Sequence, residues 1–393
     1  MTLRRRIGHK LENQRQKNIA LKLPPISKFK NTKIKSVAII GLISAPTGLG
    51  NAAQLLVNEL KQNGINIVEV DCVKIFKFPD YLKQVQENGF KDVDAVIIAI
   101  NPDIAINVLG KIGIKNLAGK KVIGYWVWEL ETPPKQWGLM AKFVHEIWTP
   151  SEFSRQALKK IFNLDIKVVR HPVALFEPPK VEVNVRDKVR SKLGIKKDDF
   201  VAFQSIAFSS SLERKNTIEA IEIFLEAFKD INNAYFVVRY FGDEHYPKSL
   251  EILKRAAQKG NGKIKLVKSS MNKIELFDFY AASDLYISLH RSEGFGLNIA
   301  EAMLVGLPVM ATNWSGSLEL CKEDNCLLID CAMIEVRDCE KIYYKTNALW
   351  AKPDREMAIS KLYEFYHNRE LKNKISERAQ KYIMDNFGAT QLF

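Results

Sequence analysis

Short apolar runs alternate with helical stretches along most of the chain, and this alternation limits the possible folds more than any other feature. Runs with the length and composition of buried strands occur at 36–43, 65–71, 94–100, 121–128, 200–208, 235–242, 263–269, 285–289 and 307–311. Strands that alternate with helices form parallel sheets. Because 393 residues are too many for one ordinary core, we expect two α/β domains of similar size.

A glycine turn lies between the last two of these runs. Residues 297–306 have the apolar spacing of a buried helix, which Gly306 ends. Gly294 and Gly296 occupy the positions where Ser, Thr or Asp would normally cap the first amides of such a helix. The sequence therefore predicts a helix start that can accept an anion, because glycine permits close approach and the helix dipole favours negative charge.

Two carboxylates flank this turn, Glu293 just before it and Glu301 one turn into the helix. Free amides and two acids at this spacing suit a phosphorylated sugar. The amides would bind its diphosphate or a hydroxyl, and the acids would accept hydrogen bonds from its hydroxyls. The alternative is an ordinary strand–helix–strand unit with two solvated glutamates, which is the better interpretation of a lone G-x-G.

The whole string SEGFGLNIAEAMLVGLPV, however, resembles the E-x7-E donor-site motif of the family 4 retaining nucleotide-sugar glycosyltransferases (glycosyl transferases group 1), without a gap. In that family the first Glu lies at the transferred sugar and the second binds the nucleotide ribose. The resemblance thus implies a catalytic role for Glu293, a ribose-binding role for Glu301, and donor binding by Gly294, Phe295, Gly296 and Leu297.

Three further segments match the same family. SLERKN places Arg214 and Lys215 where the family holds a basic pair on the donor diphosphate; without that context a solvated basic pair would be favoured. Gly48 and Gly50 match the glycine-rich loop that reaches toward the donor phosphates. In YWVWELETPPKQW, at 125–137, Trp126, Trp128 and Trp137 stand beside acids at the carboxyl end of a strand, which suits a sugar-binding rim as well as an ordinary core. The segment resembles a W-E segment of one subgroup, which favours the rim, and Glu129 stands about where many relatives have a catalytic His.

The resemblance implies the GT-B architecture, two Rossmann-like domains that face each other across a cleft, with a C-terminal helix crossing back to the first domain. The expected parts of the chain are a basic tail at 1–35, an acceptor-side domain at 36–173, a linker at 174–184, a nucleotide-sugar domain at 185–370, and a crossing helix and tail at 371–393. Helices are expected at 214–229, 247–258, 273–282, 355–368 and 370–386.

Positive charge is concentrated at the N-terminus. The net charge is +14, and residues 1–35 contain eleven Lys and Arg but one acid, which leaves +4 for the rest. This distribution disfavours nucleic-acid binding, which needs a basic face on the folded body. Two interpretations of the tail stay open, contact with an anionic membrane surface and simple disorder. Without a signal peptide or a long apolar run, we expect a cytoplasmic chain, peripheral on the inner membrane face if the tail binds lipid.

No metal or cofactor is expected. Asp92 and Asp94 form a D-x-D, but at the amino end of a strand, whereas ligands bind beyond the carboxyl ends. The cysteines, Cys72, Cys321, Cys326, Cys331 and Cys339, lack the paired spacing of zinc sites and are expected as reduced thiols.

The expected activity is that of a retaining, hexosyltransferase-like enzyme. It would move a sugar from a nucleoside diphosphate sugar to a hydroxyl of a carbohydrate or glycolipid, in surface polysaccharide or glycoconjugate synthesis. The alternatives are a GT-B phosphorylase, a sugar-nucleotide epimerase and a non-catalytic nucleotide-sugar-binding protein. The sequence specifies neither the nucleotide, the sugar, the acceptor nor the oligomeric state.

Overall fold

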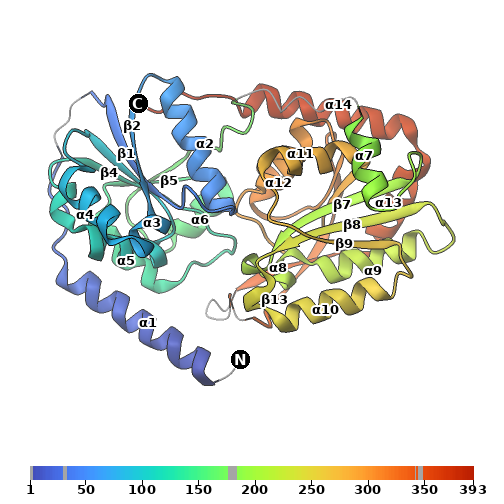
Figure 1. Ribbon diagram of the computed structural model, residues 1–393, viewed down its shortest axis with the longest axis horizontal. Helices are drawn as coiled ribbons and strands as arrows, with labels where there is room; N and C mark the ends of the chain where they lie inside the picture. Colours follow the sequence, from blue (N-terminus) through green and yellow to red (C-terminus); the bar gives the residue numbers. More distant parts are fainter. Residues whose placement is uncertain (1–2, 30–32, 176–183, 341, 344–347) are drawn as a thin grey trace. The chain divides into compact units, whose positions relative to one another are not determined.

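The structure, a computed structural model, describes residues 3–29, 33–175, 184–340, 342–343 and 348–393. The chain divides into two compact units, each a sheet with helices packed on it (Figure 1). Unit 1 contains residues 1–175 and 389–393, and unit 2 contains residues 176–388. The expected linker at 174–184 falls mainly on 176–183, outside the described residues.

In its described part, unit 1 contains one parallel sheet with the strand order β2-β1-β3-β4-β5-β6. The strands are β1 (Ser36–Gly41), β2 (Asn66–Asp71), β3 (Ala95–Ala99), β4 (Lys121–Tyr125), β5 (Glu146–Thr149) and β6 (Asp165–Val168). β1 and β3 are apolar on both faces, as expected for central strands that helices cover on both sides. The chain reverses its direction of winding between β1 and β3, which makes their carboxyl ends a switch point.

The helices of unit 1 follow the strands in alternation. They are α1 (Leu3–Lys22), α2 (Gly48–Gln62), α3 (Cys72–Lys77), α4 (Pro79–Asn88), α5 (Pro102–Ile112) and α6 (Glu152–Lys159), with 3₁₀ segments at Ile114–Leu117 and Lys135–Phe143. Local signals explain several starts: Thr47 and Ser151 cap α2 and α6 through their hydroxyls, and proline begins α4 and α5.

The basic N-terminal segment is not a separate disordered tail, which corrects one of the two interpretations above. Residues 3–22 form α1, and this helix packs against α5. Gln16 donates to the carbonyl of Asp103 at 2.8 Å, Asn107 donates to Glu12 at 2.8 Å, and Ala20 is fully buried. This helix has no strong signal in the sequence because its packed face is small and mostly polar.

In its described part, unit 2 repeats the arrangement with the strand order β12-β11-β10-β7-β8-β9, all parallel. The strands are β7 (Phe200–Ala207), β8 (Ala234–Phe241), β9 (Ile264–Lys268), β10 (Leu285–Ser288), β11 (Val309–Thr312) and β12 (Leu327–Ile329). Winding reverses between β7 and β10, so the carboxyl ends of these two strands form the switch point of this sheet.

The helices of unit 2 are α7 (Val185–Lys192), α8 (Leu212–Lys215), α9 (Thr217–Ala227), α10 (Pro247–Gln258), α11 (Lys273–Ala282), α12 (Leu297–Leu304), α13 (Arg355–His367) and α14 (Arg369–Asn386), with 3₁₀ segments at Phe208–Ser210, Asp243–His245 and Ser315–Glu319. The single helix expected at 214–229 is wrong. It is broken into α8 and α9 at Asn216, whose left-handed φ of 54° cannot continue a helix. An antiparallel hairpin of β13 (Cys331–Glu335) and β14 (Leu349–Pro353) was also not foreseen.

The C-terminus returns to the first unit, as expected, but after the last helix rather than along it. α14 packs against α12, and Ser376 donates to the carbonyl of Gly306. Residues 389–393 then join unit 1, where Thr390 donates to the buried Glu59 through its amide at 2.8 Å and its hydroxyl at 2.9 Å. Phe393 packs against Trp148 with ring centroids 5.4 Å apart.

Asp284 at the start of β10 joins several elements of unit 2. It pairs with Arg190 of α7 at 2.7 Å, Arg186 at 2.8 Å and Lys372 of α14 at 2.6 Å, and it accepts from the amide of Val201 in β7 at 2.9 Å. Burial alone would raise the pKa of the Asp284 carboxyl, but the positive charges of Lys372 and Arg186 outweigh this effect and lower the pKa to about 2. Asp284 therefore anchors the amino end of the strand whose carboxyl end carries the predicted motif.

The remaining predictions concern Asp94, the cysteines and membrane-spanning helices. Asp94 lies at the amino end of the unit 1 sheet, where it accepts from the Lys35 amide at 2.9 Å and the Ser36 amide at 3.0 Å. The five cysteines are free thiols. Across the described residues, the helices are too short or too polar to cross a bilayer.

Candidate active site

The switch point of unit 2 gathers three of the predicted residues into one cluster. Glu293 follows β10, and Arg214 and Lys215 lie in α8, just beyond β7. Arg214 Nη1 lies 3.2 Å from Glu293 Oε2, and Lys215 Nζ contacts Glu293 Oε1. The Glu293 side chain is 9% exposed and that of Arg214 is 3% exposed. Two cations and one anion thus share a buried site where parallel sheets bind ligands.

The charge state of Glu293 follows from these contacts. Burial alone would raise its pKa, but Lys215 and Arg214 lower it well below its usual range. Glu293 is therefore ionised at neutral pH, and the cluster carries a net positive charge of one. An incoming diphosphate would meet two cations whose present counter-ion is the Glu293 carboxylate.

Hydrogen bonds hold the backbone of this cluster in place. Arg214 Nη1 donates to the carbonyl of Ser292 at 2.7 Å, and the Glu293 amide donates to Ser315 Oγ at 2.8 Å. The Gly316 amide donates to the Glu293 carbonyl at 2.8 Å. A side chain at Gly316 would place its Cβ 2.1 Å from the Gly294 carbonyl oxygen, so this close approach requires glycine. Ser315 holds a left-handed φ of 75°, the kind of strain that active sites retain.

α12 begins as the sequence predicted. Gly296 is its N-cap, with φ 99°, and no side chain caps the first turn. Leu297 opens the helix and is partly exposed. The Phe295 ring is buried and packs against Phe387, with centroids 5.9 Å apart. The Phe295 side chain therefore belongs to the core, and its predicted part in donor binding is restricted to its backbone.

Glu301 lies on α12, two turns from Glu293 along the chain, and is buried with 4% of its surface exposed. Tyr280 Oη of α11 donates to Glu301 Oε2 at 3.3 Å. Burial raises the pKa of the Tyr280 hydroxyl, and the Glu301 carboxylate raises it further, so the phenol remains a proton donor to Glu301. The two motif acids thus differ: Glu293 pairs with cations, whereas Glu301 is held by a neutral hydroxyl.

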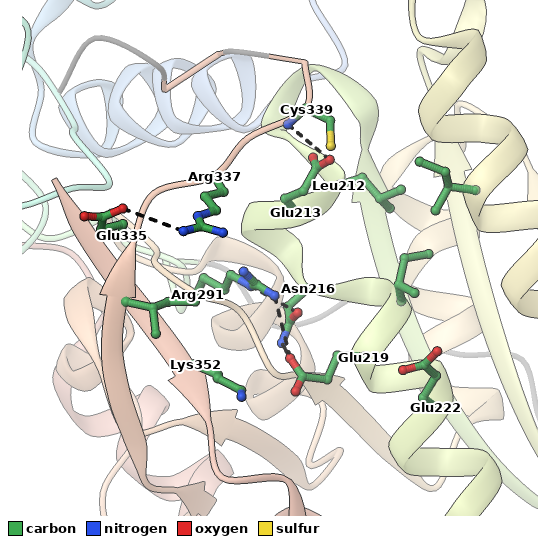
Figure 2. Close-up of a pocket in the computed structure, with 13 residues that line it drawn as sticks. Leu212, Glu213, Asn216, Glu219, Glu222, Arg291, Glu335, Arg337, Cys339 and Lys352 are labelled. Carbon is green, nitrogen blue, oxygen red and sulfur yellow. Dashed lines mark hydrogen bonds and ion pairs between the residues drawn. The ribbon is translucent and has the colours of Figure 1, made fainter. Parts of the chain in front are cut away.

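The helix break at Asn216 is part of the site and was missed from the sequence. Asn216 Oδ1 accepts from Arg291 Nε at 3.2 Å, and Asn216 Nδ2 donates to Glu219 at 2.9 Å (Figure 2). The Arg291 amide donates to the carbonyl of Arg214 at 2.7 Å, and its guanidinium lies over the Trp350 ring, 5.3 Å from the centroid. This network joins α8 to the segment that carries Glu293. Asn216, the last residue of SLERKN, was the signal in the sequence that could have indicated this break.

A cavity of about 890 Å³ lies beside this network, between α8–α9 and the β13–β14 hairpin (Figure 2). Its described lining mixes four glutamates with Arg291, Arg337 and Lys352 above a floor of aliphatic side chains. None of the residues predicted for the donor site is among them. The cavity is therefore separated from Glu293 by the wall that α8 and Arg291 form.

His290 precedes Glu293 in the loop after β10, and its side chain is fully buried. Ser317 Oγ is 2.9 Å from His290 Nε2, and the Ser288 carbonyl is 2.8 Å from His290 Nδ1. Burial lowers the pKa of the imidazole to about 4. His290 is neutral at pH 7 and supports the loop between β10 and α12.

The remaining predicted residues lie in unit 1, also beyond carboxyl ends of strands. Gly48 and Gly50 begin α2, but the Gly50 amide donates to Thr47 Oγ1 at 3.2 Å. A Cβ at Gly50 would lie 2.1 Å from the Ala45 carbonyl oxygen, so this glycine serves a tight turn. Glu129 is partly exposed in the loop after β4. The role predicted for Glu129 stays a prediction.

The tryptophans next to Glu129 are core residues, which corrects their interpretation as a sugar-binding rim. Trp126 is fully buried and packs against Phe162 with centroids 5.3 Å apart. Trp128 and Trp137 are buried edge to face at 4.9 Å. Their spacing in the sequence fitted both a binding rim and a core.

Comparison with known proteins agrees with this geometry. Residues 204–351 match the model of the family described as glycosyl transferases group 1. Over 163 residues the chain is 27% identical to the sulfoquinovosyl transferase SQD2 of Arabidopsis thaliana, which covers 41% of this chain and 28% of that protein. The chain thus matches less than a third of the length of this relative.

Solved structures resemble the chain over most of its length. Anabaena Alr3699/HepE in complex with UDP and glucose has a TM-score of 0.63 at 15% identity, covering 90% of this chain and 96% of that chain. Sucrose-phosphate synthase from Thermosynechococcus elongatus also has a TM-score of 0.63, at 12% identity, covering 90% and 95%. The chain has the GT-B fold, and its residues 204–351 match the family model of the glycosyl transferases group 1.

Proposed function

We propose that the chain is a retaining glycosyltransferase, which moves a sugar from a nucleoside diphosphate sugar to an acceptor hydroxyl. The observation that carries this proposal is the buried contact of Glu293 with Arg214 and Lys215 at the switch point of unit 2. The family match over residues 204–351 and the UDP complex of a structural neighbour support it.

In this proposal the donor lies along the start of α12. Arg214 and Lys215 bind the diphosphate, and the Gly294–Leu297 backbone binds phosphate or sugar oxygens. The buried Glu301 carboxylate accepts hydrogen bonds from the ribose hydroxyls. Glu293 lies beside the cations and therefore faces the transferred sugar next to the diphosphate.

The chemistry requires no covalent intermediate on the protein. The bond from the anomeric carbon to the diphosphate breaks, the acceptor oxygen bonds to the same face, and its proton passes to the leaving diphosphate. Arg214 and Lys215 stabilise the charge that grows on the leaving group, and Glu293 stabilises the positive charge at the anomeric carbon. Glu129, Gly48 and Gly50 of unit 1 keep the roles that the resemblance implies, catalysis for Glu129 and donor binding for the two glycines.

The proposal includes metal-independent transfer without a cofactor, because two cations, Arg214 and Lys215, already serve the diphosphate. Activity should persist in EDTA. Complete loss in EDTA that Mn²⁺ restores, together with an inactive Asp94→Asn variant, would contradict the assignment.

The proposed acceptor is a carbohydrate or glycolipid hydroxyl, in surface polysaccharide or glycoconjugate synthesis. The structures of similar fold include HepE with UDP and glucose and TarM with α-GlcNAc-glycerol and UDP. These ligands support a UDP-sugar as the first donor to test.

A membrane partner is proposed separately for α1. Its outward face carries Leu11, Arg15, Leu21 and Lys22, all exposed, so that aliphatic and basic side chains share one stripe. Such a stripe suits the headgroup region of an anionic membrane. The cytoplasmic location, peripheral on the inner membrane face, belongs to this proposal.

The function is tested by a thermal-shift screen of UDP-, GDP- and ADP-sugars in EDTA, followed by turnover with the donor that binds. A transferase releases nucleoside diphosphate only when an acceptor is supplied. Orthophosphate-dependent turnover would indicate a phosphorylase, and acceptor-free conversion of the donor would indicate an epimerase. Tight binding without turnover by any acceptor would favour a binding protein, and the absence of any donor-induced shift would contradict the proposal.

A further inference from the structure

Arg239 is a buried arginine that neither the sequence motifs nor the proposed function uses. It lies near the carboxyl end of β8, directly opposite Ser205 of β7 in the sheet register. Only 5% of its surface is exposed. A guanidinium at this depth is costly unless acceptors or counter-ions surround it.

The partners of Arg239 do not satisfy the guanidinium. Nη1 donates to Ser205 Oγ at 3.0 Å, and the guanidinium lies over the Phe241 ring, 4.3 Å from the centroid. Nε is buried without a hydrogen-bond partner. Among the ion pairs of the described residues, none includes Arg239. Its cation therefore has one hydroxyl and one aromatic face where a carboxylate would be usual.

The surroundings of Arg239 connect it to the start of α12. Asn298, the second residue of that helix, donates from Nδ2 to the Ser205 carbonyl at 3.2 Å. Burial lowers the pKa of the Arg239 guanidinium, while the negative charge of the Glu301 carboxylate acts in the opposite direction. Arg239 thus lies on the Glu301 side of α12, whereas Arg214 and Lys215 lie at Glu293.

We infer that Arg239 is a specificity-determining residue, which donates hydrogen bonds to an acceptor oxygen of the donor nucleoside. This inference rests on the proposed function, because it needs a nucleoside diphosphate along α12 with its ribose at Glu301. The shared chemistry of the ligand is an uncharged oxygen, either a ribose hydroxyl or a base carbonyl. The diphosphate has its own cations, so the donors of Arg239 that are not bonded to Ser205, Nε among them, remain for the nucleoside.

The nucleoside also explains why the guanidinium is held without a carboxylate. A permanent ion pair would occupy the N–H donors of the Arg239 guanidinium. Ser205 and Phe241 instead fix the plane of the guanidinium and leave its other donors for an incoming acceptor. Binding then satisfies a nitrogen that is unpaired in the free protein, which strengthens the hydrogen bond in this buried position.

The test compares UDP, ADP and inorganic pyrophosphate by titration calorimetry in EDTA, with the full-length wild type, Arg239→Gln and Arg239→Lys. UDP and ADP share ribose, the adenine of ADP lacks a carbonyl, and pyrophosphate lacks the nucleoside. Arg239→Gln should bind UDP roughly ten- to a hundredfold more weakly and pyrophosphate as the wild type does. If ADP affinity also falls, the acceptor is on the ribose; if only UDP affinity falls, it is a base carbonyl.

Arg239→Lys keeps the charge and tests the geometry, so it should also weaken UDP more than pyrophosphate. Arg255→Gln removes an equal charge from the exposed surface of α10 and serves as the matched control, with unchanged affinities. Equal loss for UDP and pyrophosphate, or no loss for UDP, overturns the inference while the proposed function stands. If the wild type binds none of the three probes and no nucleotide sugar, the proposed function itself fails.

Discussion

Replacing Glu293 by Gln should have opposite effects on stability and on nucleotide binding. In the free protein its carboxylate pairs with Arg214 at 3.2 Å and contacts Lys215. Gln keeps the shape but not the charge, which leaves two neighbouring cations without a counter-ion. Because removing one partner of a buried pair costs about 3–5 kcal/mol, and Gln keeps an acceptor oxygen, we expect about 3 kcal/mol of lost stability.

The same change removes a competitor for the diphosphate. In the wild type Glu293 already neutralises part of the charge on Arg214 and Lys215, whereas in Glu293→Gln the diphosphate becomes their counter-ion. The nucleoside diphosphate should therefore bind at least as tightly as to the wild type, and its thermal stabilisation should be larger. Turnover should fall by roughly one to two orders of magnitude in kcat, since one charge-assisted hydrogen bond at the transferred sugar is lost.

Scanning calorimetry with and without UDP, titration calorimetry and initial rates measure the three effects. For a unit of this size the lost stability corresponds to a Tm about 6–12 °C lower. Glu335→Gln is the matched control, because its partner Arg337 lies 3.9 Å away and the two side chains are 80% and 87% exposed. A tenfold loss of UDP affinity in Glu293→Gln, or an unchanged kcat, would refute the assigned role.

Four further predictions concern other parts of the molecule. Glu301→Ala should raise KM and weaken UDP binding about tenfold or more with a smaller effect on kcat, because Glu301 faces an unchanging part of the donor; equal kcat losses in Glu301→Ala and Glu293→Gln would contradict this. Asp284→Asn should lower the free energy of unfolding by about 3–5 kcal/mol, since it strands the buried Arg190, whereas Asp324→Asn, which loses only an exposed pair with Arg378, should change it by less than about 1 kcal/mol in denaturant titrations. The free energy of unfolding should fall as the pH drops from 6.5 to 4, because His290 takes up a proton in the unfolded chain but, with its pKa lowered to about 4, stays neutral in the folded protein. The expected loss is on the order of 3 kcal/mol. A His290→Gln variant with the same dependence of stability on pH would rule out this origin. Arg15→Glu with Lys22→Glu should weaken cosedimentation with phosphatidylserine vesicles in a salt-dependent way and leave turnover of a soluble acceptor unchanged, whereas vesicle binding equal to that of the wild type would remove α1 from consideration.

Most strands and most helices could be predicted from the sequence because their signals are local. The helices expected at 247–258 and 273–282 agree with α10 and α11, which begin at a proline and at an Asn272–Glu275 capping box. The helix break at Asn216 was missed because its cause is a left-handed φ that Glu219 supports locally and Arg291 supports from a distant part of the chain. No pattern along the sequence contains that contact.

The same distinction applies to the candidate site. Glu293, Arg214 and Lys215 could be named because family motifs contain them, and the structure shows that they meet. Ser315, Gly316 and Arg239 could not be named, since their importance depends on the Glu293 amide 2.8 Å from Ser315, a close backbone approach and an unsatisfied guanidinium. The tryptophans near Glu129 show the reverse error, because spacing alone did not reveal that their rings are buried.

The most direct test of the central claim is the anomeric configuration of the first product. The donor found by binding, in an α-linked gluco-configured form, is incubated with its acceptor and EDTA, and the anomeric proton is followed by time-resolved ¹H NMR. The account predicts an α-anomeric signal that grows with release of the nucleoside diphosphate and is delayed by one to two orders of magnitude in Glu293→Gln. A β-anomeric first product, or transfer at the wild-type rate in Glu293→Gln, would contradict it.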